Sequence, residues 1–247
     1  MAIFSRIGLQ GAFTIAHVIV GIMWMGLLWF FNFVQTPAYA EMDPAARNNA
    51  FDKLTWRALW WFRWAAAATV AFGVIIIGVA PKDTFGGDFW KSTAGVTLLI
   101  GILFGIVMLY NVWMIIWPNQ QIVIANARNV LAGGEADPNA PAAARAGAMA
   151  SRQNTIFSLP LLVFMVGASH FYTLDHFSFR PGGGKWIVYF LIGLAVLVVL
   201  ELNALGKISG RGSTGLNVIY ESHKNAMYAG FALIVAFYIL AEILLRA

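Results

Sequence analysis

Six long apolar segments with few charges constrain this sequence more than any other feature. A helix needs about 20 apolar residues to cross the hydrocarbon core of a bilayer, and each segment is long enough and bounded by turn-forming residues. None of the segments alternates with a two-residue period, which excludes a closed β-barrel. We therefore predict an all-α integral membrane bundle that forms a single domain over residues 1–247. Its expected spans are residues 9–34, 58–80, 93–117, 155–174, 186–205 and 218–245.

The composition agrees with a membrane protein and excludes several kinds of chemistry. Hydrophobic residues make up 60% of the chain and charged residues only 11%, whereas a soluble domain carries about 25% charged residues. The chain has no cysteine, which excludes disulfides, thiolate nucleophiles, iron–sulfur clusters and covalently attached c-type haem. The basic residues are scattered over loops, so we expect a lipid bilayer and no nucleic acid as partner.

Prolines and polar segments predict where the spans end. Pro37, Pro81 and Pro118 are expected to end the first three helices. Three connecting segments have helical patterns of their own. They predict short helices outside the membrane at residues 41–57, 119–132 and 137–151.

The distribution of Lys and Arg predicts the orientation of the bundle. The loops after the first, third and fifth spans, with the adjoining helix ends, hold ten of the 16 basic residues, and the opposite side holds six. Because cytoplasmic loops carry an excess of Lys and Arg, both termini are expected outside the cytoplasm, in a bacterial inner membrane. The tryptophans near the start of the second span are expected to lie at the lipid headgroups.

Two of the four histidines lie inside predicted spans, His17 in the first and His170 near the outer end of the fourth. Ionisable groups within a membrane are costly and often mark function. Both imidazoles are expected in the outer leaflet, where they could supply the two axial ligands of a b-type haem. Gly21 lies one turn from His17 and Trp24 continues that face. We therefore predict His17 and His170 as metal ligands, with Gly21 and Trp24 as further cofactor-binding residues.

Simpler roles are open for the same residues. His170 could bond to Ser169 or to a loop carbonyl with nothing bound. His17 could bridge two helices through a neutral hydrogen bond, and Gly21 is equally well explained as a helix-packing residue.

Polar residues near the inner ends of the spans add a second group. Asn111 is expected to satisfy its amide across a helix interface. Glu201 and Asn203 lie near the inner end of the fifth span, where they could approach His223. We expect solvated charges at the membrane surface there, with a substrate or proton-entry site as the alternative.

Four strings of residues carry a family resemblance. They are HVIVGIMWMGL at 17–27, RALWWFRW at 57–64, NVWMIIWPNQ at 111–120 and SRQNTIFSLPLLVFM at 151–165. In this order they resemble the membrane domain of bacterial urate oxidases of the membrane type, over about the first 175 residues. His17, His170, Trp113, Trp117 and Asn154 occupy the matching strings or follow them closely.

The resemblance implies an inner-membrane domain connected with purine degradation and with a cytochrome c electron acceptor. Such proteins often carry a C-terminal cytochrome c domain, and this chain contains no Cys-x-x-Cys-His site. We therefore expect a separate cytochrome c or respiratory-complex subunit as partner. The chain is predicted to pass electrons from urate or another small reductant to that partner through haem b.

Two other functions are open. The chain could be a non-catalytic accessory subunit of a larger respiratory or transport complex, with its aromatic faces as contacts. A channel or carrier for small solutes is the weaker alternative, because the sequence shows no internal repeat.

Overall fold

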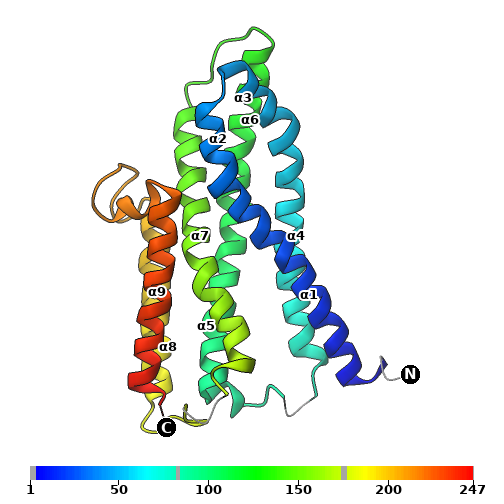
Figure 1. Ribbon diagram of the computed structural model, residues 1–247, viewed down its shortest axis with the longest axis vertical. Helices are drawn as coiled ribbons and strands as arrows, with labels where there is room; N and C mark the ends of the chain where they lie inside the picture. The colour runs from blue at the N-terminus through cyan, green and yellow to red at the C-terminus, as the bar shows by residue number, and fades with distance from the viewer. Residues whose placement is uncertain (1–3, 82–83, 174–176, 247) are drawn as a thin grey trace.

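The computed structural model describes residues 4–81, 84–173 and 177–246. Helices dominate this part of the chain, which contains no strand and only an isolated bridge between Phe177 and Arg246. The all-α prediction is confirmed. Long helices run side by side along the longest axis, and the start of α1 lies at the same end of the bundle as the end of α9 (Figure 1).

Three continuous helical rods precede the longest single helix. Each rod contains one π-helical turn, in which a backbone N–H donates to the carbonyl oxygen five residues earlier instead of four. The rods are α1 (Arg6–Trp29), η2 (Phe30–Gln35) and α2 (Thr36–Glu41); α3 (Pro44–Ala50), η3 (Phe51–Thr55) and α4 (Trp56–Val79); and α5 (Thr93–Tyr110), η5 (Asn111–Ile116) and α6 (Trp117–Leu131). The remaining helices are α7 (Ala140–His170), α8 (Lys185–Ala204) and α9 (His223–Leu244), with short 3₁₀ turns at η4 (Phe89–Lys91) and η6 (Gly215–Tyr220).

The expectation that Pro37 and Pro118 end their helices is wrong, because a π-helical turn precedes each of them. In a regular helix the proline ring clashes with the carbonyl four residues earlier and removes a hydrogen bond. Here the N–H of Thr36 donates to the carbonyl of Phe31, five residues back, and the same pattern occurs before Pro118. Since the turn before it is widened, each proline enters the first turn of a new α-helical segment without breaking the rod.

The expected short helices at residues 41–57, 119–132 and 137–151 are not separate surface helices. The structure makes them the ends of long helices, so that the three rods comprise 36, 36 and 39 residues and α7 comprises 31. At 1.5 Å per residue the rods are about 55 Å long, well beyond the ~30 Å hydrocarbon core. The bundle therefore has a protruding end, formed by α2, α3, η3, α6 and the first turns of α7, which extends past α8 and α9 (Figure 1).

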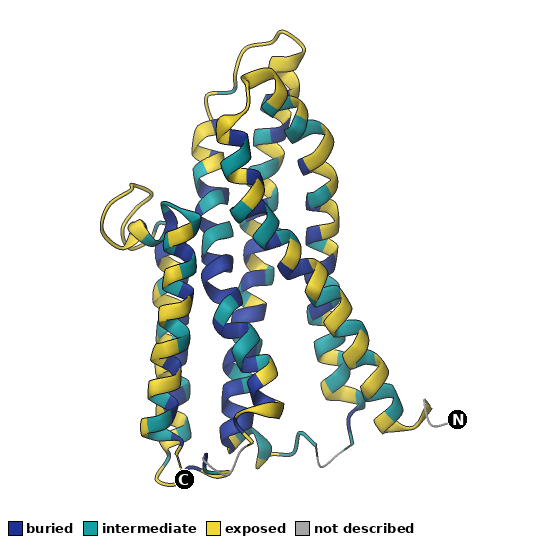
Figure 2. Cartoon of the chain, viewed as in Figure 1, coloured by how far each residue is buried: buried dark blue, intermediate teal, exposed yellow. Residues whose placement is uncertain are grey.

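Five helical segments of the described chain are long and apolar enough to cross a membrane: the three rods, α8 and α9. Residues 155–170 of the predicted fourth span belong to α7, which packs against α5, α6, α8 and α9, and residue 174 of that span lies outside the described residues. Side chains along much of α7 are buried, whereas α1, α4, α8 and α9 expose many apolar side chains (Figure 2). The bundle thus places α7, with its buried polar side chains, at the centre and its apolar surfaces outside, as a bilayer requires.

Small residues allow the close contacts around α7. A Cβ added to Gly230 of α9 would lie 2.7 Å from the Leu159 side chain and 3.0 Å from the carbonyl oxygen of Ile156 on α7. Because one of these atoms belongs to the backbone, the contact cannot relax by a change of rotamer alone.

We predict that Gly230→Ala lowers the thermal unfolding temperature of the detergent-purified protein, by overpacking that costs about 1–3 kcal/mol. Gly26→Ala is the matched control, since a Cβ at Gly26 meets nothing within 4 Å. Equal unfolding temperatures for the two variants would contradict the described packing of α9 on α7.

Candidate functional site

His17 lies on the face of α1 that packs against α4. Its Nδ1 is 2.8 Å from the carbonyl oxygen of Thr69, so the ring donates a hydrogen bond between the two helices. A Cβ added to Gly73 of α4 would lie 3.3 Å from the imidazole, and one added to Gly21 would lie 3.8 Å from the methyl group of Thr69. His17 and Gly21 therefore take part in the contact between α1 and α4.

His170 ends α7 in an exposed position. Its Nδ1 lies 2.7 Å from the hydroxyl oxygen of Ser169 and 3.2 Å from the carbonyl oxygen of Val166. Both partners belong to its own helix. Trp24, the remaining predicted cofactor residue, is buried in the core with 1% of its surface exposed.

The two histidines lie at similar depth. The indole N–H of Trp29 on α1 donates to the hydroxyl of Ser158 on α7 at 3.0 Å. His17 precedes Trp29 by twelve residues and His170 follows Ser158 by twelve. However, α1 and α4 diverge together from α5 and α7 toward this end (Figure 1).

Each histidine bonds to a backbone carbonyl oxygen through Nδ1, which leaves its Nε2 free to bind a metal. His17 faces α4, His170 bonds to its own helix, and the described residues form no cluster of three or more metal-ligating side chains. We assign no step of the chemistry to haem, and ligation by these two residues stays a prediction.

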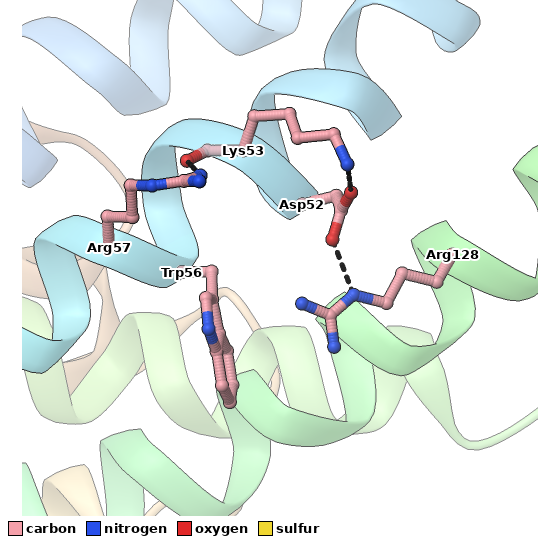
Figure 3. A pocket seen from close by; sticks show the side chains of 5 residues that line it. All are labelled: Asp52, Lys53, Trp56, Arg57 and Arg128. Carbon is pink, nitrogen blue, oxygen red and sulfur yellow. Dashed lines mark hydrogen bonds and ion pairs between the residues drawn. The ribbon is translucent and has the colours of Figure 1, made fainter.

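A different site lies on the protruding end, between η3, the first turn of α4 and α6. It is a pocket of about 330 Å³ lined by Asp52, Lys53, Trp56, Arg57 and Arg128 (Figure 3). The carboxylate of Asp52 pairs with Nζ of Lys53 and with Nε of Arg128, each at 2.5 Å. One acidic side chain therefore fixes two cations at the rim of the pocket.

The chemistry of this pocket favours a flat anion. The pocket is lined by three cationic side chains and one carboxylate, so its lining carries an excess of positive charge. The Arg128 guanidinium lies 4.9 Å from the centre of the Trp56 ring, and planar guanidinium and indole groups both stack on flat ligands. Nη1 of Arg57 donates to the carbonyl oxygen of Lys53 at 2.6 Å, which leaves its other N–H groups for a ligand.

An aromatic row runs from the pocket along α4 and η5. The rings of Trp56 and Trp117 have centroids 5.3 Å apart, and the Arg63 guanidinium lies 3.5 Å from the Trp117 ring and 5.1 Å from the Trp113 ring. Trp64 then meets Trp113 edge-on at 5.3 Å. These contacts hold the pocket wall in place and connect it with the tryptophans that the sequence predicts at the lipid headgroups.

Sequence reasoning missed this pocket. Asp52 and Arg128 are 76 residues apart in the chain, and each belongs to a segment that reads as an ordinary polar helix end. The available signal is the combination of Trp56 with basic residues at 53 and 57, of which Trp56 is used above for membrane anchoring and the basic residues for orientation.

Fold and site together define a class: an all-α, multi-pass membrane domain with a cationic, aromatic pocket on a protruding end. A family model described as "Urate oxidase N-terminal" matches residues 63–206, more than half of the chain. The chain therefore belongs to the urate oxidase N-terminal family, and the resemblance seen in the sequence is confirmed. Searches of curated proteins and of solved structures give no match. The matched region includes Arg128 and the aromatic row from Arg63 onward, and it excludes residues 52–57.

Proposed function

We propose that this chain is the membrane domain of a redox system in the bacterial inner membrane. In this system urate, or another small planar anionic reductant, is oxidised and its electrons pass to a cytochrome c partner. Membership in the urate oxidase N-terminal family supports the urate-oxidase-like role. The observation that carries the choice of reductant is the pocket in Figure 3.

The charge and volume of the pocket support urate as its ligand. Urate is a flat bicyclic molecule with a negative charge at neutral pH, and a volume of about 330 Å³ lies within the range of small-molecule sites. Arg57 and Arg128 offer N–H donors to anionic oxygens, and the Trp56 ring adds a flat apolar wall beside them. Asp52 holds Arg128 in place, so this donor loses little conformational freedom when a ligand binds.

We predict that the detergent-purified chain binds urate and that Arg57→Gln weakens binding about tenfold, the loss expected for one charge-assisted hydrogen bond. Isothermal titration calorimetry measures the affinity. Arg47→Gln is the control, because Arg47 lies on α3 at the same end but does not line the pocket. Absence of urate binding, or an equal loss in both variants, would contradict the assignment.

Electron transfer has its own test. Membranes that contain the chain should reduce added oxidised cytochrome c when urate is supplied, and Arg57→Gln should lower the rate at subsaturating urate. Stopped-flow absorbance of cytochrome c measures the rate, with membranes lacking the chain as control. If urate binds and no cytochrome c is reduced under anaerobic conditions, the redox proposal is wrong and an accessory role is favoured.

The sequence-based prediction of haem b is tested by a visible spectrum of the purified protein. If His17 and His170 are its axial ligands, a reducible Soret band is present and both His17→Ala and His170→Ala remove it. A wild-type protein without this band contradicts haem ligation and leaves His17 as a contact between α1 and α4.

A further inference from the structure

A buried polar cluster lies where η5, α7, α8 and η6 meet. Its members are Asn111, Gln153, Asn154, Glu201 and Tyr220, and all but Glu201 are completely buried. The expectation that Glu201 is a solvated charge at the membrane surface is wrong. Only 9% of Glu201 is exposed, because η6 and the neighbouring turns fold back over the end of α8.

The hydrogen bonds of this cluster fix the orientation of its amides. Nδ2 of Asn111 donates to Oδ1 of Asn154 at 3.0 Å and to Oε2 of Glu201 at 2.9 Å. Nδ2 of Asn154 donates to the carbonyl oxygen of Met108 at 3.0 Å. Both partners of Asn111 accept, so its amide nitrogen must face them and both of its hydrogens are used.

Two acceptor oxygens are left without a donor. Oδ1 of Asn111 and Oε1 of Glu201 are buried and have no hydrogen-bond partner among the described residues, and the donor Nε2 of Gln153 has none either. A buried polar atom without a partner costs free energy, and an ionised carboxylate costs far more than a neutral one. A proton on Oε1 would neutralise Glu201 and remove the cost of a buried, unpaired carboxylate.

The charged groups around Glu201 do not neutralise it. Among the described residues, no Lys, Arg or His forms an ion pair with it. Arg152 on α7 donates instead to the backbone carbonyl of Tyr220, and Arg145 pairs with Glu221 at 2.5 Å.

The other titratable neighbours face elsewhere or stay neutral. His223, at the start of α9, packs against Phe33 of η2. The Tyr220 hydroxyl donates to Oε1 of Gln153 at 2.7 Å. Burial, with the nearby Glu201 carboxyl adding to it, raises the pKa of Tyr220 well above its ordinary value, so this phenol keeps its proton.

We propose that Glu201 is a proton-binding site of the membrane domain, protonated on Oε1 at neutral pH and held by Asn111 through Oε2. This site stands apart from the pocket of Figure 3 and does not depend on which reductant binds there. It gives the domain a place to take up a proton on the side that we expect to face the cytoplasm.

Infrared spectroscopy of the purified full-length chain tests this proposal. The wild type at neutral pH should show the carbonyl stretch of a protonated carboxylic acid, which shifts on exchange into D₂O. Glu201→Gln should remove this band, and it preserves the shape and the acceptor oxygen that Asn111 requires. Glu221→Gln is the control and should retain the band, because Glu221 lies outside the cluster and pairs with Arg145.

A second measurement covers the case in which Glu201→Gln does not fold. Dicyclohexylcarbodiimide reacts with protonated carboxyl groups in apolar surroundings, and mass spectrometry of wild-type peptides should find the label on Glu201 and not on Glu221. Absence of both the band and the label would overturn the proposal. Sodium-dependent thermal stabilisation in the wild type, without the band, would overturn it too and would assign the orphan oxygens to a cation.

Discussion

The structure depends on how α7 satisfies its polar side chains away from water. In a bilayer, apolar helix faces gain little by meeting each other instead of lipid, so hydrogen bonds and close packing decide which helices associate. The middle of α7 is rich in polar residues, and these form hydrogen bonds with α1, η2, α5, η5 and η6. The anchoring contacts are Trp29 with Ser158, Asn32 with Ser151, Asn111 with Asn154, and Tyr220 with Gln153.

These anchors explain the shape of the bundle. They join α1 to α7 only at its C-terminal end, so the N-terminal half of α1 follows α4 and diverges from the centre (Figure 1). On the other side, α8 and α9 are only 20 and 22 residues long and stop below the protruding end. The pocket is therefore formed by residues of the rods alone, because α8 and α9 end before they reach it.

The sequence predicts the helices of this fold better than it predicts which helices and side chains pack against each other. Apolar length locates the spans, because the bilayer sets a minimum for it. The proline rule failed at Pro37 and Pro118, since it assumes α-helical geometry in the preceding turn. His17 was correctly placed within a span, yet its neighbour Thr69 follows from the pairing of α1 with α4, which no local pattern encodes. Glu201 looked interfacial because it lies near the end of a span, and the turns that cover it come later in the chain.

The π-helical turns have a consequence for how each rod presents its sides. A turn that holds one additional residue shifts the helical phase by about 100°. The stripe that contacts lipid below η2 or η5 therefore does not continue straight into α2 or α6. In each rod the helical segments before and after the π-helical turn are rotated relative to each other about a common axis. Lipid-facing and water-facing surfaces can therefore be specified by separate stretches of sequence, without a loop between them.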